Sequence, residues 1–236
     1  MKRIIDRLRG RNATANPIRT VPGMEPVYRD LFLRELARCG VADTFYPVGP
    51  AANHSMMYFI ARVLQDHRFI SILDLGAGQT SILIDQIRAA TSGMYSVRTV
   101  EHDRFWAERI GAQISHEVIA APLVKRTVKG RDIGWYDLPL AVWKEPVDLL
   151  IVDGPPGYDE QVRYARTGAL DIAASVLKED FVVVVDDSER VGEYELVQQL
   201  KALFRARGVA FASGTLHAYK CQTILAAGKY RDAAYF

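Results

Sequence analysis

The chain has 236 residues, of which 49% are hydrophobic and 25% charged, and its formal net charge is +2. These fractions are typical of a soluble globular protein and exclude collagen-like, coiled-coil and disordered chains. The small net charge gives no reason to expect a nucleic-acid partner. The longest uninterrupted apolar run, residues 181–185, is too short to span a membrane.

Helical spacing, apolar runs and turn residues predict the elements in chain order. Residues 1–50 are expected to form an N-terminal helical extension and loop, and residues 51–236 one domain. Asn53 or Ser55 is expected to be the N-cap of the domain's first helix. The expected helices are 28–39, 55–64, 80–90, 103–115, 160–177 and 191–207, and the expected strands are 69–75, 95–101, 123–128 (the weakest), 147–153, 181–186, 209–215 and 221–227.

The alternation of strands and helices predicts an α/β fold with a doubly wound, mostly parallel sheet. Strands that consist almost entirely of Val, Ile and Leu are covered on both faces, as in such a sheet. The last two strands are joined by a short connection and should pair antiparallel. Ligands bind at the carboxyl ends of the strands in these folds, so the residues that end each strand are the candidate site residues.

The basic N-terminus and the cysteines bear on location. Residues 1–9 lack the apolar core of a secretory signal. We interpret them as a frayed terminal helix, with an arm for a membrane surface or an acidic partner as the alternative. Cys39 and Cys221 have no metal-binding or redox spacing. These features predict a cytoplasmic protein with reduced thiols.

A glycine turn, Gly76-Ala77-Gly78, follows the first strand and leads into a helix. Glycines allow the backbone to turn tightly and a ligand to approach it closely. The next strand ends in Glu101, where a carboxylate can accept both ribose hydroxyls of a nucleoside. This combination predicts a nucleoside-binding site.

The neighbouring residues distinguish between two kinds of nucleoside. A dinucleotide motif requires a third glycine where Ser81 stands, and Asp74 would repel a pyrophosphate. S-adenosylmethionine (SAM) carries an ammonium and a sulfonium, which Asp74 and Asp153 could bind by charge-assisted hydrogen bonds. We therefore predict SAM as the cofactor. The alternative is that Asp74 only caps the turn and the glycines only shape it.

Three stretches carry a family resemblance. Residues 72–78 (ILDLGAG) resemble motif I of class I SAM-dependent methyltransferases, Val100-Glu101 resembles their ribose-binding acidic position, and residues 149–156 (LLIVDGPP) resemble the motif at their fourth strand. The resemblance implies a seven-stranded Rossmann-like sheet whose last-inserted strand is antiparallel. The cofactor-binding residues expected from the motifs are Asp74, Gly76, Ala77, Gly78, Ser81, Glu101, His102, Asp153 and Gly154.

A narrower resemblance involves residues 152–158 and 185–191. These stretches are similar to the glucuronoxylan 4-O-methyltransferase family, which has a similar Asp-Gly-Pro turn and a similar acidic-Arg-Val stretch after the next strand. This chain lacks the histidine that precedes the first aspartate in that family. The resemblance implies that the methyl acceptor is a sugar hydroxyl.

Asp153 ends one predicted strand, and Asp186 and Asp187 end the next. Neighbouring strands lie about 4.8 Å apart, so three carboxylates would repel each other unless a cation neutralised them. A divalent cation such as Mg²⁺ would do so. The arrangement is similar to the metal site of catechol O-methyltransferase-like enzymes, with Asp187 in place of an Asn. Alternatively, Asp186 caps the following helix and Arg190 pairs with either aspartate.

Candidate catalytic bases are Asp153, His54 and His217, because both histidines lie in loops expected to face the ligand. His102 is expected beside the cofactor. His67 and His116 are expected at the surface.

Trp135 and Tyr136 follow the weakest strand. There they could stack on adenine or pack on the core.

These features predict methyl transfer from SAM to a hydroxyl of a sugar or another small polar molecule, with a homo-oligomer as an open possibility. An amine-, protein- or nucleic-acid-directed methyltransferase is an alternative, although the chain has Asp153-Gly154-Pro155-Pro156 where amine-directed enzymes commonly carry an Asn-Pro-Pro-Tyr type motif. An NAD-linked dehydrogenase and a non-catalytic SAM-fold binding module are further alternatives.

Overall fold

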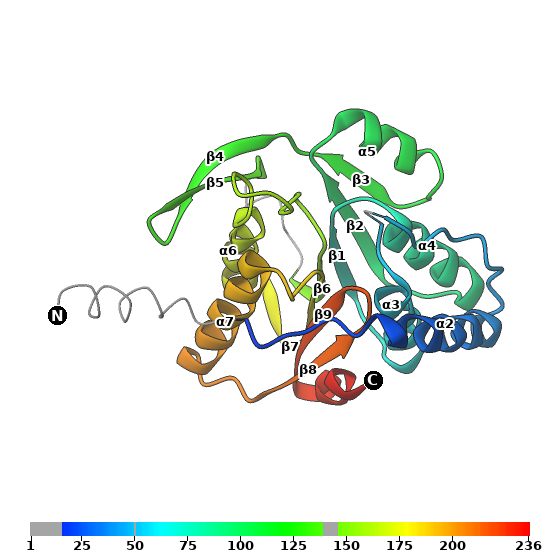
Figure 1. Ribbon diagram of the computed structural model, residues 1–236. Coiled ribbons are helices and arrows are strands. Elements are labelled where there is room, and N and C mark those ends of the chain that lie inside the picture. Colours follow the sequence, from blue (N-terminus) through cyan, green and yellow to red (C-terminus); the bar gives the residue numbers. More distant parts are fainter. Residues whose placement is uncertain (1–15, 50, 139–145) are drawn as a thin grey trace.

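The structure is a computed structural model that describes residues 16–49, 51–138 and 146–236. A seven-stranded sheet lies between two groups of helices, α2, α3 and α4 on one side and α6 and α7 on the other (Figure 1). The helices are α2 (Glu25–Cys39), α3 (His54–Asp66), α4 (Gln79–Thr91), α5 (Arg104–Gly111), α6 (Ala169–Ser175) and α7 (Val191–Ala206), with 3-10 turns η1 (Pro22–Met24), η3 (Ala165–Gly168) and η4 (Gly228–Tyr235). The strands are β1 (Ser71–Leu75), β2 (Ser96–Glu101), β3 (Glu117–Ala120), β4 (Leu123–Val128), β5 (Arg131–Tyr136), β6 (Val147–Val152), β7 (Leu177–Val185), β8 (Phe211–His217) and β9 (Cys221–Ala227).

The strand order is β3-β2-β1-β6-β7-β9-β8. The pairs from β3 to β7 are parallel, and β9 runs antiparallel to both β7 and β8. The last strand in the sequence is therefore inserted antiparallel, and the predicted fold is confirmed. Since β1 pairs with both β2 and β6, the order reverses at β1, which is where doubly wound sheets bind ligands.

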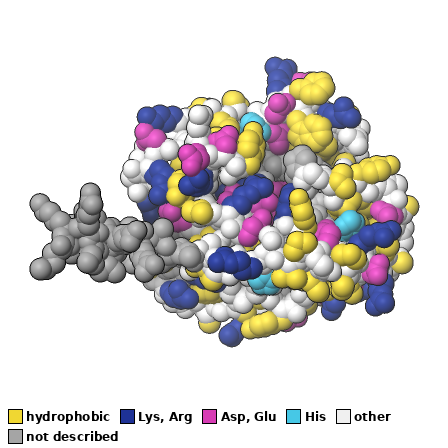
Figure 2. Space-filling model, viewed as in Figure 1, with side chains coloured by type: hydrophobic (Ala, Val, Ile, Leu, Met, Phe, Trp, Pro, Cys, Tyr) yellow, Lys and Arg dark blue, Asp and Glu magenta, His cyan; other side chains and the backbone are white. Residues whose placement is uncertain are grey.

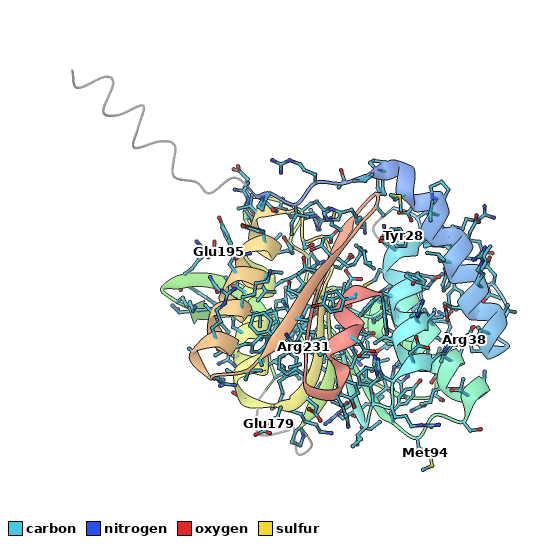
Figure 3. All side chains as sticks on the ribbon, turned by 90° about the horizontal axis from the view of Figure 1, so that it is seen from below. Tyr28, Arg38, Met94, Glu179, Glu195 and Arg231 are labelled. Atoms are coloured by element: carbon cyan, nitrogen blue, oxygen red, sulfur yellow. The ribbon has the colours of Figure 1, made fainter. Side chains whose placement is uncertain are left out.

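Apolar side chains cover both faces of the central strands. Every residue of β1 and β6 is buried, which explains why these strands read as almost continuous apolar runs. On one face α2 packs on α3 through Phe32 and Leu36, which are 1% and 2% exposed. Figure 3 shows α2 from below, with Tyr28 near its start and Arg38 near its end. The predicted helix at 28–39 is confirmed, while the division of the chain at residue 50 stays a proposal.

The predicted third strand at 123–128 is assigned to the wrong sheet. The third parallel strand is β3, only four residues long and partly exposed, so its apolar signal is weak. Residues 123–128 form β4, which pairs with β5 in a separate hairpin that projects from the body of the protein (Figure 1). Lys129 and Gly130 both have positive φ, 48° and 77°, as a two-residue hairpin turn requires.

The predicted helix at 160–177 is also wrong in extent. Only η3 and the short α6 are helical, and β7 already begins at Leu177. Asp159 Oδ1 accepts hydrogen bonds from the N–H groups of Gln161 and Val162, as in an Asx turn or a helix cap, and residues 160–164 form turns instead of a continuous helix. The predicted helix at 103–115 ends early, at Gly111. In the part of the chain described, no helix has both the length and the apolar character that crossing a membrane requires.

Candidate active site

The carboxyl ends of three neighbouring parallel strands, β1, β6 and β7, bring candidate residues together. Leu75 pairs with Val152, and Val152 pairs with Val185. The residues that follow these positions, Gly76, Asp153 and Asp186, therefore begin their loops side by side. Acidic and basic side chains lie next to one another in the middle of the face shown in Figure 2.

Two loops approach each other so closely that both need glycine. Gly76 has a φ of +102°, and a Cβ there would lie 3.0 Å from the Gly154 nitrogen. A Cβ on Gly154 would lie 2.9 Å from Gly76 Cα and would overlap the hydroxyl oxygen of Tyr136. Gly78 differs, because a Cβ there would meet no described atom within 4 Å. The loop is therefore tight at Gly76 and open at Gly78.

Gly154→Ala is expected to lower the free energy of unfolding by about 1–3 kcal/mol, because the new methyl group overpacks the contact with Gly76 and Tyr136. Gly78→Ala is the matched control. Its Cβ enters open space, so the change should stay below about 1 kcal/mol. Urea unfolding of both variants measures the difference. Equal losses of unfolding free energy in the two variants would contradict the finding that the backbone is tightly packed at Gly154 and open at Gly78.

Glu101 is 5% exposed and already oriented. Its Oε2 accepts a hydrogen bond from the Ala77 N–H at 3.0 Å, its Oε1 accepts one from the Asp103 N–H at 2.8 Å, and His102 Nδ1 lies 2.6 Å from Oε1. Burial raises the pKa of Glu101, but the contacts with His102 and the backbone outweigh burial and lower it. The same contact with Glu101 raises the pKa of His102. The carboxylate is therefore held ionised beside the glycine loop, and His102 helps to position it.

Asp74 is fully buried under the same loop. Its Oδ2 accepts hydrogen bonds from Ser81 Oγ at 2.6 Å and Thr99 Oγ1 at 3.3 Å. Ser81 Oγ also accepts a hydrogen bond from the Gly78 N–H at 3.1 Å. Asp74 Oδ1 has no hydrogen-bond partner among the described residues. Burial raises the pKa of Asp74 to about 7.

This pKa predicts a pH-dependent stability. Folded Asp74 keeps its proton up to about pH 7, whereas an unfolded aspartate loses it near pH 4. The folded state therefore binds more protons in this window, and the contribution of Asp74 to the free energy of unfolding falls as pH rises from about 4 to 7. Asp74→Asn should gain stability relative to the parent across the window, by an amount on the order of 4 kcal/mol. Urea unfolding at pH 4 and pH 8 measures this; a constant difference between the two proteins would contradict it.

Asp153, Asp186 and Asp187 form an acidic cluster. Each offers a carboxylate oxygen within 4.8 Å of the others, as the strand ends predicted. Asp186 Oδ2 and Asp187 Oδ1 have no hydrogen-bond partner in the described part of the chain, although Lys220 Nζ lies 3.8 Å from Asp187 Oδ1. Burial, and next the neighbouring Asp186, raise the pKa of Asp153 and of Asp187. The cluster therefore retains oxygens that can accept further bonds.

Arg166 was not predicted from the sequence, yet it lies inside this cluster with 4% of its surface exposed. Its Nη2 is 3.3 Å from Asp153 Oδ1, its Nη1 is 3.1 Å from Asp187 Oδ2, and its Nε is 3.7 Å from Glu193 Oε1. It also donates to the backbone carbonyls of Pro155 and Asp186. One buried guanidinium thus neutralises part of the charge that the sequence assigned to a metal ion.

The alternatives for Asp186 and Arg190 have different outcomes. Arg190 Nη1 lies 2.9 Å from Asp187 Oδ2, so the predicted pairing is confirmed. Asp186 does not cap the next helix, because the N-cap of α7 is Arg190 itself. Asp186 Oδ1 instead accepts a hydrogen bond from Gln222 Nε2 at 2.6 Å.

Solved structures of known proteins resemble this chain. An O-methyltransferase from Bacillus cereus, solved with S-adenosylhomocysteine (SAH), has 14% sequence identity and a TM-score of 0.51, over 85% of this chain and 90% of that one. This chain has the Rossmann-like methyltransferase fold. Methyltransferases from Pyrococcus furiosus (14% identity, 84% and 96% of the two chains, TM-score 0.47) and Geobacter sulfurreducens (12%, 97% and 97%, 0.46) also resemble it. No family model and no curated protein matches.

In this fold, residues 16–25, called here the N-terminal segment, lie beside the acidic cluster, where Asn16 Nδ2 donates to the carbonyl oxygens of Ser188 and Glu189. Glu25 of α2 accepts hydrogen bonds from Asn53 Nδ2 and the His54 N–H, both at 2.7 Å, and its Oε1 lies 3.0 Å from His54 Nδ1. His217 Nδ1 lies 2.8 Å from the Arg19 carbonyl oxygen. Both candidate histidines are therefore oriented through Nδ1 by residues from the N-terminal segment.

The surface positions expected for two histidines need correction, whereas one of the two alternatives for Trp135 is confirmed. His116 is not at the surface: it is 8% exposed and bonds with Thr99 Oγ1 at 2.9 Å. His67 is half-buried, with its ring stacked at 5.5 Å on Phe236. Trp135 packs on the core, where its ring occupies the space that a Cβ on Gly168 would need.

Proposed function

We propose that this protein transfers a methyl group from SAM to a hydroxyl oxygen of a sugar or another small polar molecule. The observation that carries the proposal is the pairing of Glu101, a buried and ionised carboxylate, with the open glycine loop at Gly78. The fold shared with an SAH-bound O-methyltransferase supports the same function.

The residues fit this cofactor. Glu101 would bind the ribose hydroxyls, and the open backbone at Gly78 leaves room for the ligand to cross the end of β1, while Gly76 allows the loop to pass close to Gly154. Asp153 would favour its cationic end, and so would Asp74 in its ionised form, since Asp74 Oδ1 has no partner in the described residues. Gly154 keeps the second loop close to the first.

When bound, SAM would supply a methyl group carried on a sulfonium, which departs from the methyl carbon as the neutral thioether of SAH. The chain's own residues then have to align the acceptor oxygen and take its proton. Without a bound metal, we propose Asp153 as the proton acceptor, because it is the member of the acidic cluster that follows the strand next to the glycine loop, with His54 and His217 as further candidates at the same edge. A small acceptor is consistent with the N-terminal segment, which bonds across this edge through Asn16, Arg19 and Glu25.

We also propose that Asp153, Asp186 and Asp187 hold a divalent cation such as Mg²⁺. Each of the three carboxylates offers an oxygen within 4.8 Å of the others, and Asp186 Oδ2 and Asp187 Oδ1 have no described hydrogen-bond partner, which suits a hard cation. The cation would lower the pKa of the acceptor hydroxyl and orient it.

Chelation tests the cation. Methyl transfer is expected to fall about 100-fold or more after treatment with EDTA and to recover with Mg²⁺, if the cation supplies several kcal/mol of stabilisation. Calorimetry with Mn²⁺ should show binding to the parent and loss of binding in Asp186→Asn. Full activity after metal removal would mean that Arg166 and Lys220 provide all the positive charge that the site needs.

The function itself is tested by SAH binding and by transfer of labelled methyl from SAM to a panel of sugars and small polyols. Binding and turnover with a hydroxyl acceptor are expected. Binding without turnover on any acceptor would favour a non-catalytic module, and a protein that binds neither SAM nor SAH would overturn the proposal.

The free cysteines Cys39 and Cys221 are consistent with our further proposal of a reducing, cytoplasmic location.

A further inference from the structure

Tyr136 places an unusual hydroxyl group beneath the glycine loop. The residue is 0% exposed, and its Oη has no hydrogen-bond partner within residues 16–49, 51–138 and 146–236. Buried hydroxyl groups in proteins are nearly always hydrogen-bonded, because leaving one unpaired loses its bonds to water. An unpaired hydroxyl at this depth therefore calls for a partner beyond the described residues, and a ligand bound at the adjacent glycine loop would supply one.

The hydroxyl lies at the point where the two glycine loops meet. A Cβ on Gly154 would overlap Tyr136 Oη, and the same Cβ would lie 2.9 Å from Gly76 Cα. The charged groups that influence the Tyr136 pKa, after burial itself, are Glu101, Arg166, Asp74 and Asp153. Burial raises this pKa well above its usual value, so the hydroxyl keeps its proton and can donate a hydrogen bond.

The hairpin of β4 and β5 fixes this position. Tyr136 is the last residue of β5 and pairs with Leu123, and the next N–H, that of Asp137, donates to the Pro122 carbonyl at 2.9 Å. Trp135 anchors the hairpin against Gly168. The Tyr136 ring belongs to the apolar cluster that contains Leu75 and Val152, so it packs on the core, and its hydroxyl lies by the loops.

We infer that Tyr136 Oη donates a hydrogen bond to the adenosine part of the bound methyl donor. The inference rests on the proposed function, because it requires that SAM or SAH bind at the glycine loop. Adenosine is favoured over the methionine end because Tyr136 Oη lies where Gly154 meets Gly76, and the next residue of that turn, Ala77, donates its N–H to Glu101, the expected ribose ligand.

The test compares Tyr136→Phe with the parent by calorimetry, using SAH and 5′-methylthioadenosine, which retains the nucleoside but lacks the amino acid. Loss of one hydrogen bond should weaken both ligands by about 2- to 12-fold. Without ligand, the melting temperature should stay equal or rise, because the variant loses a buried hydroxyl that has no described partner.

Tyr230→Phe is the matched control. Tyr230 is 1% exposed, and its hydroxyl donates to the Arg68 carbonyl at 2.7 Å, away from the loops. This variant should melt at a lower temperature and bind SAH like the parent.

Four outcomes decide between the proposals. A Tyr136→Phe protein that binds SAH as tightly as the parent overturns the inference, and so does one that melts well below the parent. Weakened SAH with unchanged 5′-methylthioadenosine overturns the assignment to adenosine. A parent that binds no SAH overturns the proposed function instead.

Discussion

Arg166→Met is expected to lower the free energy of unfolding by about 3–5 kcal/mol, the largest stability loss that we predict at this site. The guanidinium is 4% exposed and contacts Asp153, Asp187 and Glu193, the last of which is fully buried. Methionine has a similar length but no charge. Removing one partner of a buried ion pair leaves the other charges buried without compensation, which costs far more than losing a surface pair.

Arg190→Met is the control for this prediction. Arg190 contacts the same Asp187 carboxylate at 2.9 Å, but its side chain is 33% exposed, so water can replace much of the interaction. Its loss should stay near or below about 1 kcal/mol. Urea unfolding of the two variants provides the measurement. Similar losses of unfolding free energy in the two variants would contradict the argument that burial makes the ion pairs of Arg166 more important for stability than those of Arg190. If Arg166→Met does not fold, Arg166→Lys, which retains the charge but not the planar hydrogen-bonding geometry, should fold with an intermediate loss.

The glycine loop and the acidic cluster were predictable because their signals are local. Each strand is a short apolar run, and the next residue is Gly76, Asp153 or Asp186. In a parallel sheet, neighbouring strands end at the same edge, and the observed pairs Leu75–Val152 and Val152–Val185 place these residues side by side. The sequence therefore contained both the chemistry of these residues and their proximity.

Arg166 was not predictable in the same way. It stands between Ala165 and Thr167 in a segment whose pattern suggested an ordinary helix, and nothing nearby marks it as buried. Its partners come from the ends of β6 and β7 and from α7, so only the tertiary structure brings them to the guanidinium. Contacts of this kind decide whether a metal ion or an arginine side chain neutralises buried carboxylates.

The hairpin that carries Tyr136 was missed for a different reason. Its exposed residues are mostly charged and gather next to the turn, and buried residues occur only at Ile133, Trp135 and Tyr136, so the apolar pattern is weak. The adjacent Lys129 and Gly130 were a usable turn signal. Reading them as a hairpin would have placed residues 123–136 outside the main sheet.

Glu101→Ala is expected to weaken SAH binding about 100-fold or more. A hydrogen bond to a charged group is worth about 1.5–3 kcal/mol, and the carboxylate can accept one from each ribose hydroxyl. The loss of binding free energy should exceed the value of these two hydrogen bonds alone. The reason is that the Ala77 N–H and His102, which both contact the Glu101 carboxylate, also lose their partner. Glu108→Ala is the control: it removes an exposed carboxylate of α5 that pairs with Arg104, and SAH affinity should not change. Calorimetry on proteins with matched circular dichroism spectra measures both. If Glu101→Ala binds SAH like the parent, the nucleoside does not lie at the end of β2, and the proposed SAM site fails with it.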